Sequence, residues 1–494
     1  MMQRTSNPKL ILIEPKAPNL HIFSGMSLPR LGTILLGTIA HKYGWDVSVI
    51  IEEQSPVNWE EAYDADLVGI STITSTAPRA FAMADRLRKH DVPVILGGPH
   101  VTFLPDEALE HADFVMRGEG EAAFPKFLEA ILLGKPFETV PNLSWRGPDG
   151  TVTHNEMIPP AVDLDELPQP DFSLVHGRML KMGGKFVIPI QTSRGCPFDC
   201  SFCSVTGMFG RKFRFRSTDN IIQELRQFNS PKNYIFFYDD NFMASPKHAR
   251  ELLDRMAEEK FTFKWSAQVR ADLARDEEIV KRMRKAGCHT VFIGFETINP
   301  EALEDIRKKT SIDDLRNAAD TFRRHGIHVH GMFILGLDSD NAKTVKQTVR
   351  FARHHRIGTA QFLILIPLPG TSQFEQLQQE GRIKFTDWSL YDAHHVVYQP
   401  KQFSLMSLQR AQINAHRTFY SLSESVKRLA AFKFEEFAIA VYARGLNRNW
   451  KRKNKSFLKL LALLGKGKKR GLHIVADVHQ IVDLDAPNSK ERAA

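Results

Sequence analysis

The sequence predicts an α/β protein with two successive parallel-sheet domains, a doubly wound, Rossmann-like domain and then a partial (β/α)6 barrel of the TIM type. From residue 9 to about 135, short Val/Ile/Leu runs alternate with amphipathic stretches, and a second alternation of this kind covers residues 186–385. Apolar strands separated by helical periods are typical of a parallel sheet covered by helices. We therefore expect domains at 1–140 and 186–385, a linker at 141–185 and a helical C-terminal region at 386–494.

Small or polar residues end three strands of the first domain. Ligands in doubly wound sheets bind outside the carboxyl ends of the strands, so these residues are candidate binding positions, although the glycines are equally compatible with ordinary tight turns. They are Ser71, Thr72, Gly97, Gly98, Gly118 and Gly120. The expected strands are residues 10–15, 47–51, 67–72, 92–98 and 114–121, and the main helices are 31–44, 80–90 and 122–132.

Residues 141–185 are rich in Pro, Gly and Asp, which suits a connection between domains. The second alternation then begins, and polar segments follow several of its strands. Active sites of such barrels lie at the C-terminal ends of the strands, so we expect these segments to meet at one rim. The expected strands are residues 186–193, 233–240, 263–270, 290–297, 328–337 and 360–371.

After about residue 385, polar helices replace the strand pattern and the charge becomes asymmetric. Residues 401–494 hold 19 Lys and Arg against 7 Asp and Glu, whereas the rest of the chain holds 47 against 50. The segment 432–469 is basic, with Phe, Leu and Trp on its other side. This composition predicts either contact with an anionic membrane surface or packing of residues 457–464 on the domain. Nucleic acid is not an expected partner, because aromatic residues are few there and no RNA-binding module is recognisable.

The cysteine content and the N-terminus predict the compartment. Four cysteines, three of them crowded together, cannot form a secreted disulfide framework, and residues 1–10 lead into a strand without the apolar region of a signal peptide. No apolar run reaches the ~18 residues of a membrane-spanning helix. We expect a cytoplasmic protein, with peripheral contact at the inner membrane surface if the basic C-terminal region binds lipid.

Three cysteines, Cys196, Cys200 and Cys203, follow the first expected barrel strand with C-x3-C-x2-C spacing. Three thiolates in one short loop can bind one soft metal centre. A structural zinc site normally has four ligands, and the remaining cysteine, Cys288, lies where we expect a small buried residue. The pattern favours an iron–sulfur cluster with one iron open to substrate, and a zinc-bearing or other non-catalytic metal-binding module is the alternative.

With an aromatic residue before its third cysteine, this loop resembles that of the radical S-adenosylmethionine (SAM) enzymes. The resemblance implies that the cysteines hold a 4Fe–4S cluster whose open iron binds SAM, and that cleavage of SAM yields a 5′-deoxyadenosyl radical. The residues that the resemblance makes candidates for SAM binding are Phe202, Asp239, Asp240, Ser266, Arg270 and Glu296. Each polar one is nearly as compatible with an ordinary hydrogen bond or ion pair at the barrel rim.

The first domain followed by the barrel resembles the cobalamin-binding branch of this superfamily, and residues 97–121 are similar to the run that closes the cobalamin domain there. The resemblance implies that cobalamin lies against Ser71, Thr72, Gly97, Gly98, Gly118 and Gly120. Many such domains carry a D-x-H-x-x-G motif whose His binds cobalt, and this chain has PKAPNLHIFSG instead. We interpret His21 as a loop histidine, and a domain that binds no corrin is the alternative.

The number of cysteines limits the chain to one cluster, which excludes relatives with auxiliary clusters. Resemblance to hopanoid methylases and to anaerobic magnesium-protoporphyrin ester cyclases implies two reaction types. These are cobalamin-dependent methylation of an unactivated carbon on a small-molecule or lipid substrate, and radical oxidation or cyclisation. We predict methylation, with a reducing electron donor such as flavodoxin or ferredoxin. The sequence identifies no catalytic residue beyond the cofactor-binding candidates.

Overall fold

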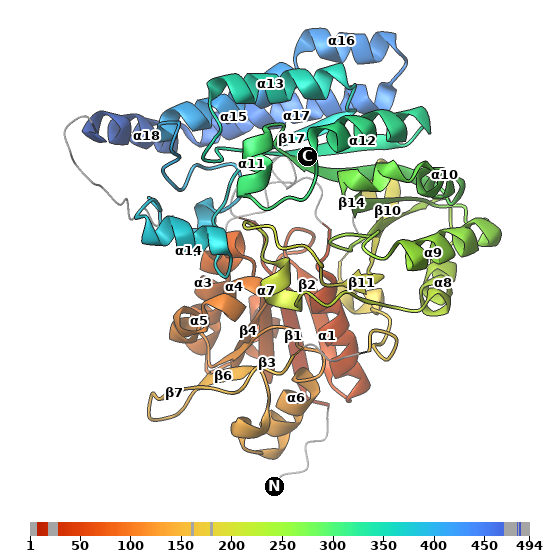
Figure 1. Ribbon diagram of the computed structural model, residues 1–494. Helices are drawn as coiled ribbons and strands as arrows, with labels where there is room; N and C mark the ends of the chain where they lie inside the picture. The colour runs from red at the N-terminus through yellow and green to blue at the C-terminus, as the bar shows by residue number, and fades with distance from the viewer. Residues whose placement is uncertain are drawn as a thin grey trace.

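The computed structural model describes residues 7–17, 28–159, 163–177, 181–468, 482, 484 and 485. Two large sheets organise these residues, one of eight strands and one of seven. Figure 1 shows the first sheet with its helices (red to orange) below the second (green to cyan), and the C-terminal helices (blue) beyond the second sheet. The two sheets and the C-terminal helices thus follow one another in space as they do in the sequence.

The first sheet is doubly wound, as predicted. Its strand order is β7-β6-β5-β4-β3-β1-β2-β8, and the pairs from β5 to β2 are parallel. The winding reverses between β1 and β3, and open sheets bind ligands at such a point, outside the carboxyl ends of the strands. The parallel strands are β1 (Lys9–Glu14), β2 (Asp46–Ile51), β3 (Leu67–Ser71), β4 (Val94–Gly97) and β5 (Phe114–Met116). The helices are α1 (Leu31–Lys42), α2 (Trp59–Tyr63), α3 (Ala77–Arg88), α4 (Pro99–Phe103), α5 (Pro105–His111) and α6 (Phe124–Leu133).

Residues 141–185, which we expected to connect the domains, also complete the first sheet. β6 (Leu143–Arg146) pairs antiparallel with β5 and with β7 (Val152–His154), and β8 (Val175–His176) lies parallel to β2 at the other edge. β9 (Lys181–Met182) then pairs antiparallel with the first strand of the second sheet. Strands this short do not complete the alternation by which a strand is recognised in a sequence.

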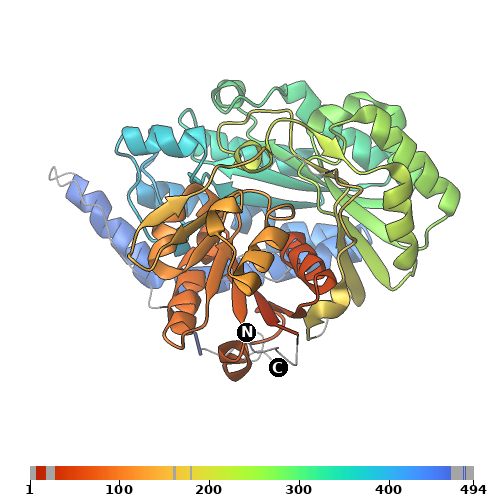
Figure 2. The same ribbon diagram turned by 90° about the horizontal axis from the view of Figure 1, so that it is seen from below.

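The second sheet is an open half-barrel of six parallel strands, as predicted, with β17 at one end and the antiparallel β9 at the other. In Figure 2 the first domain lies in front of the half-barrel, whose green helices form an outer layer on one side. The strands are β10 (Lys185–Ile190), β13 (Asn233–Phe237), β14 (Lys264–Val269), β15 (Cys288–Glu296), β16 (His328–Leu335) and β17 (Thr359–Ile364). The helices are α8 (Thr218–Gln227), α9 (Pro246–Glu259), α10 (Glu277–Lys285), α11 (Pro300–Asp305), α12 (Ile312–Arg324), α13 (Ala342–His354) and α14 (Ser372–Gln379).

The C-terminal helices cover the edge of β17. An exposed strand edge presents unpaired backbone groups, and side chains from α15 bind them here. Tyr420 donates to the Ala360 carbonyl at 2.8 Å and accepts from the Ala360 N–H at 2.9 Å, and His416 Nε2 accepts from the Phe362 N–H at 3.3 Å. Burial lowers the pKa of His416 to about 4, which keeps it a neutral acceptor. These helices are α15 (Leu405–Phe419), α16 (Leu422–Ala430), α17 (Phe434–Lys453) and α18 (Lys455–Lys468).

Packing of residues 457–464 on the domain is confirmed. The Phe457 ring lies 5.5 Å from that of Phe385, and Leu461 is fully buried in the barrel core. Cys288 is buried in the same core, as expected for a small apolar residue. Among the described residues, none of the helices combines the length and apolar content needed to cross a membrane. The end of the basic segment, from residue 469 on, lies outside the described residues except for 482, 484 and 485.

Candidate active site

The cysteine loop leaves the half-barrel after β10. A short antiparallel pair, β11 (Ser193–Arg194) with β12 (Arg214–Phe215), closes its base, and α7 (Val205–Phe209) lies within it. Gly195 begins the loop with a φ of 84°, and a Cβ there would lie 2.6 Å from the Lys212 carbonyl oxygen, so only glycine fits. In Figure 1, α7 lies between the first domain and the half-barrel. The loop is therefore held at the junction of the two sheets.

The three thiols lie close together, since Cys196 raises the pKa of Cys200 and both raise the pKa of Cys203. Burial is the largest cause for each thiol, and it raises the pKa of Cys203 to about 12. Arg270 and Lys308 act in the opposite direction on the first two thiols. Three converging, desolvated thiols beside two cations are suited to a metal cluster, because binding removes the protons and the positive surroundings stabilise the thiolates.

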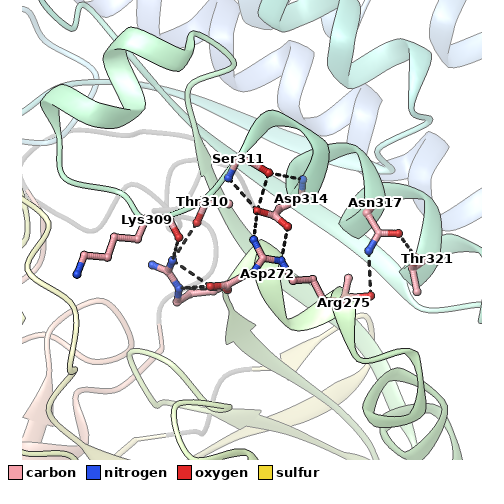
Figure 3. A network of polar contacts seen from close by, with 10 residues as sticks. Asp272, Arg275, Lys309, Thr310, Ser311, Asp314, Asn317 and Thr321 are labelled. Atoms are coloured by element: carbon pink, nitrogen blue, oxygen red, sulfur yellow. Dashed lines mark hydrogen bonds and ion pairs between the residues drawn. The ribbon is translucent and has the colours of Figure 1, made fainter.

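Arg270, after β14, joins the cysteine loop to the barrel. Its guanidinium carbon lies 3.6 Å from the centre of the Phe198 ring of the loop. On the barrel side it donates to the Lys309 carbonyl at 3.0 Å and to Thr310 Oγ1 at 2.9 Å, and it pairs with Asp272. Figure 3 shows three of these partners, Asp272, Lys309 and Thr310, close to one another. Arg270 thus brings a fixed positive charge to the loop, and its role in SAM binding stays a prediction.

Glu296 forms a buried ion pair at the end of β15. Lys308 Nζ lies 2.7 Å from Glu296 Oε1, and both side chains are nearly excluded from solvent. Glu296 has a φ of 56°, and the register of β15 against β16 shifts beside it. A non-glycine residue in this conformation costs of order 1–3 kcal/mol and persists where its surroundings require it. Both charges influence the pKa of Cys200, so the pair lies beside the cysteine loop.

The two adjacent carboxylates after β13 have different surroundings. Asp239 is fully buried and accepts hydrogen bonds from the Thr192 N–H at 3.1 Å, Thr192 Oγ1 at 2.9 Å and Ser193 Oγ. Asp240 lines a cavity between the domains and raises the pKa of two of the three thiols. Burial raises the pKa of each carboxyl group to about 6. Asp239 therefore anchors the start of the cysteine loop, whereas the carboxyl group of Asp240 faces the cavity beside the thiols.

Two further SAM-binding candidates lie away from the rim cavities. Ser266 is buried in β14, where its hydroxyl contacts that of Tyr234, whereas Gln268, two residues nearer the rim, lines the barrel cavity. Phe202 packs partly buried against the barrel core. Their roles toward SAM stay predictions.

A cavity of about 360 Å³ lies between the two domains. The half-barrel contributes Arg194, Tyr238 and Asp240 to its wall, together with α7. Thr72 does not line it, because this residue is buried and donates from its N–H and hydroxyl to the Gly97 carbonyl at 2.7 and 2.9 Å. The first domain contributes the other five predicted positions, Ser71, Gly97, Gly98, Gly118 and Gly120. One cavity thus joins the strand ends of the first sheet to the cysteine loop.

Glycines keep the first-domain wall of this cavity free of side chains. Gly98 has a φ of 103°, and a Cβ there would lie 2.3 Å from the Thr72 carbonyl oxygen, so no other residue fits. At Gly97 a Cβ would meet only the Met116 carbonyl oxygen, at 3.9 Å. Gly97 is therefore required by neither backbone conformation nor the protein's own packing, which suits a wall that a bound group approaches closely.

Buried ion pairs lock the two domains together at this cavity. Glu119 and Glu121 follow β5, and Arg194 lies two residues before Cys196. Arg194 Nη2 lies 2.7 Å from Glu121 Oε1 and Nη1 lies 3.2 Å from Glu119 Oε2, and Arg214 pairs with Glu119 as well. Although burial acts to raise it, the Arg194 guanidinium holds the pKa of Glu121 below its ordinary value. These ion pairs therefore connect the wall of the cavity directly to the start of the cysteine loop.

Two more cavities adjoin the first. One of about 310 Å³ occupies the interior of the half-barrel and shares Tyr238 and Asp240 with it. This cavity is also lined by Leu28, Phe236, Gln268, Phe292 and Gln361. Another of about 580 Å³ adjoins the first at Gly118, Glu119 and Glu121. The interior of the half-barrel therefore offers aromatic faces with two amide groups beside a carboxylate.

Comparison with known proteins agrees with this geometry. Residues 190–352 match the model of the Radical SAM superfamily, and residues 24–128 match that of the B12 binding domain. The bacteriochlorophyllide d C-12(1)-methyltransferase of Chlorobaculum tepidum is 30% identical over 433 residues, which cover 86% of this chain and 90% of that protein. The chain belongs to the cobalamin-binding radical SAM family. Its cofactors are accordingly a 4Fe–4S cluster, SAM and cobalamin.

Two further similarities describe the range of this family. The anaerobic magnesium-protoporphyrin IX monomethyl ester cyclase of Rubrivivax gelatinosus is 27% identical over 370 residues, covering 72% of this chain and 66% of that protein. The solved structure of the cobalamin-dependent SAM radical enzyme OxsB, with aqua-cobalamin and SAM bound, aligns with a TM-score of 0.65 at 16% identity, over 92% of this chain and 75% of that one. The second likeness confirms the predicted fold.

The residues present fit these cofactors. The three converging thiols suit the cluster, and the glycine wall at the strand ends suits the broad surface of a corrin. His21 lies outside the described residues, so its interpretation stays a prediction. Sequence reasoning missed Arg194 and Lys308, although the alternation of glycine and glutamate at residues 118–121, directly after a strand, could have indicated buried partners for the two acids.

Proposed function

We propose that the protein is a cobalamin-dependent radical SAM methyltransferase that acts at an unactivated carbon of a small-molecule or lipid substrate. The observation that carries the proposal is that Tyr238 and Asp240 line two cavities at once, one against the glycine wall and one inside the half-barrel. Cobalamin, SAM and substrate would thus share one space. When bound, the cluster supplies an electron for reductive cleavage of SAM, and cobalamin carries the methyl group.

The chain's own residues position these groups. Asp240 presents a carboxylate beside the thiols, where it is the partner for the ammonium group of SAM. Arg270 supplies the matching positive charge for the SAM carboxylate. Asp239 and Arg194 both hold the start of the loop in place, Asp239 through Thr192 and Arg194 through Glu121. The aromatic rings of the barrel interior exclude water from the space where the substrate is bound, which protects a reactive radical from side reactions.

Radical oxidation or cyclisation without methyl transfer is the second candidate, and the similarity to the Rubrivivax cyclase supports it. The two reactions leave different products of SAM. Anaerobically reconstituted protein is incubated with cobalamin, a reductant, SAM and a membrane-lipid extract of the source organism, and the products are measured by mass spectrometry. Methyl transfer gives S-adenosylhomocysteine together with 5′-deoxyadenosine, and both are lost without cobalamin.

Formation of 5′-deoxyadenosine alone, together with a changed substrate, favours the second candidate. Formation of neither product overturns both. Cys200→Ala is expected to lose the cluster and all cleavage of SAM, because two thiolates cannot replace three. Cys288→Ala is the matched control, since Cys288 is buried in the core away from the loop, and it is expected to keep about four irons per protein.

Contact with an anionic membrane surface is proposed for α16 and the turn into α17, rather than for α18. The exposed side of α16 carries Leu422, Val426 and Leu429 beside Ser423 and Lys427, and its inward face carries the buried Ser425. The exposed fractions are 62% for Leu422, 61% for Val426, 80% for Phe432 and 61% for Phe434. Figure 1 shows α16 at the end of the molecule opposite the first domain. The excess of Lys and Arg in residues 401–494 complements an anionic surface.

Co-sedimentation with vesicles of anionic and of neutral lipid tests this contact. The double change Phe432→Ser and Phe434→Ser is expected to weaken binding to anionic vesicles about tenfold or more, from the apolar area lost. Leu463→Ser, at an equally exposed position on α18, is the control and is expected to bind as wild type does. Truncation after residue 430 is a poorer test, because it removes Leu461 from the core. Unchanged binding of the double variant would exclude this surface.

The electron donor, a flavodoxin or ferredoxin, is proposed to dock beside the cysteine loop. Arg211 and Lys212 are exposed there, and Arg211 lies next to Asp199 of the loop. Positive charge at this point attracts acidic redox proteins. Arg211→Glu is expected to slow cluster reduction by reduced flavodoxin but not by dithionite, and equal rates with flavodoxin would contradict the docking site.

A further inference from the structure

Two histidines and a glutamate converge at the other end of the half-barrel from the cysteine loop. His289 is the second residue of β15, His328 is the first residue of β16, and Glu435 lies in the first turn of α17. One ligand atom of each lies within 4.8 Å of the others. Because these residues begin their strands while the cysteine loop follows the end of a strand, the cluster is separate from the active site.

The hydrogen bonds of His289 orient its ring toward the glutamate. His289 Nδ1 lies 2.8 Å from Thr290 Oγ1, and Nε2 lies 3.5 Å from Glu435 Oε2. When Nδ1 donates its proton to the threonine, Nε2 presents a lone pair toward a carboxylate oxygen, and a cation can bind between these two acceptors. A hydrogen bond from the distal ring nitrogen is the usual way in which proteins orient an imidazole that binds a metal.

Charged side chains of both signs surround the cluster. Burial lowers the pKa of His289, Glu435 acts to raise it, and the nearby His328, Lys264 and Arg284 act in the same direction as burial. The two cationic side chains oppose a bound metal ion. Against them stand the carboxylate of the cluster and that of Glu436, whose Oε1 lies 3.6 Å from His328 Nδ1. Glu436 is also paired with Lys433 at 2.9 Å and with Arg428 at 3.8 Å, so the support for a bound cation is the convergence of the three ligand groups.

We propose that His289, His328 and Glu435 form a binding site for a borderline-soft divalent cation of the zinc type. Two imidazoles and one carboxylate are a known ligand set for zinc, with a fourth position for water, whereas calcium and magnesium prefer oxygen ligands alone. Ligand atoms around tetrahedral zinc are about 3.3 Å apart. The ligand atoms here lie within 4.8 Å of one another, and the exposed side chain of Glu435 can rotate to shorten its distances to the two imidazoles.

The ion would join three elements that are far apart in the sequence. Two of the ligands come from neighbouring strands of the half-barrel, and the third comes from the helix that follows the exposed turn at Phe432 and Phe434. Bound zinc therefore fixes the first turn of α17 against the base of the barrel. Its stabilising effect depends on zinc concentration, as for any ligand that binds only the folded state.

Zinc binding is measured on the anaerobically reconstituted holoenzyme, so that the cluster already occupies the cysteines. The protein is passed over a chelating resin, equilibrated with zinc at micromolar concentration, and analysed for zinc and iron. Wild type is expected to retain one zinc beyond its cluster iron, with a higher melting temperature. His328→Gln and Glu435→Gln are each expected to weaken binding at least about tenfold. His355→Gln is the matched control, because His355 also lies beside a histidine and a carboxylate, His354 and Asp320, and it is expected to leave zinc binding unchanged.

X-ray absorption at the zinc edge identifies the ligands. The proposal requires nitrogen and oxygen neighbours at about 2.0–2.2 Å and no sulfur at about 2.3 Å. Zinc bound through sulfur, or zinc retained equally by wild type and by both cluster variants, would overturn the site. Retention of no zinc by a wild-type holoenzyme with a full complement of iron would overturn it too. Unchanged SAM cleavage in His328→Gln shows that the variant has folded.

Discussion

The two parallel sheets turn their carboxyl strand ends toward the same cavity, yet these ends are built in opposite ways. The first sheet presents backbone, at Gly97, Gly98 and Gly118, whereas the half-barrel presents the charged side chain of Asp240, and Arg270 lies against Phe198 of the cysteine loop. Backbone without side chains leaves room for the large corrin ring of cobalamin. Charged side chains compensate the charges of SAM and of the 4Fe–4S cluster. The same edge of a parallel sheet can thus recognise a cofactor by the absence of side chains or by their charge.

The largest expected effect comes from separating the two regions. Arg194→Met leaves Glu121 buried without its partner, and breaking a buried pair in this way costs about 3–5 kcal/mol. We expect looser docking of the domains and loss of cobalamin retention, measured by urea unfolding and by absorbance after gel filtration. Arg194→Met combined with Glu121→Gln should recover part of the loss, because the second change removes the unpaired charge. If the free-energy changes of Arg194→Met and Glu121→Gln simply added in the double variant, coupling between these two residues would be contradicted.

The glycine wall is tested by two neighbouring changes. Gly98→Ala places a Cβ against the Thr72 carbonyl oxygen in a strained conformation, and a loss of about 2–3 kcal/mol in the free energy of unfolding is expected. Gly97→Ala meets no such contact and is expected to fold as wild type does, but to bind cobalamin about tenfold more weakly or worse. Normal cobalamin binding by Gly97→Ala would show that the corrin does not lie against this wall.

The charged side is tested by the two neighbouring carboxylates. Asp239→Asn replaces an oxygen that accepts hydrogen bonds by an amide that donates them, so we expect a loss of about 1–3 kcal/mol and less iron per protein. Asp240→Asn is expected to keep its iron while the KM for SAM rises about tenfold, because an ion pair with the ammonium group is lost. Iron analysis and initial rates separate the two. If Asp240→Asn lost the cluster instead, the assignment of roles would be reversed.

The smallest effect concerns the edge of β17, which faces neither cofactor. His416 has a pKa of about 4 in the folded protein against 6.5 as its ordinary value. The unfolded chain therefore binds more protons between these values, and stability falls as the pH drops from 6.5 toward 4. Between pH 7.5 and pH 5.5 we expect the free energy of unfolding of wild type to fall by roughly 1 kcal/mol more than that of His416→Gln, because glutamine does not titrate. If the urea midpoints of the two proteins shifted equally between pH 7.5 and pH 5.5, this prediction would be contradicted.

The sequence predicted those features that depend on short stretches of chain. The parallel strands β1–β5, β10 and β13–β17 were found because apolar runs and helical periods are local patterns, and the cysteine loop was found because its three thiols lie within eight positions. It did not distinguish Asp239 from Asp240, because adjacent residues of one type differ only in what the fold places around them. The strands β6, β7 and β8 were not distinguished from a connection between the domains, because the stretch 141–185 that contains them is rich in Pro, Gly and Asp.

The sequence by itself determined the two α/β domains, the cluster-binding loop and the family, since periodicity and spacing act within a few turns of chain. Only the tertiary structure decided which groups meet across long separations. Arg194 finds Glu121 across the domain boundary, Tyr420 binds the edge of β17, and His289 meets Glu435. Such contacts depend on how whole elements pack, and packing brings together residues that no local pattern connects.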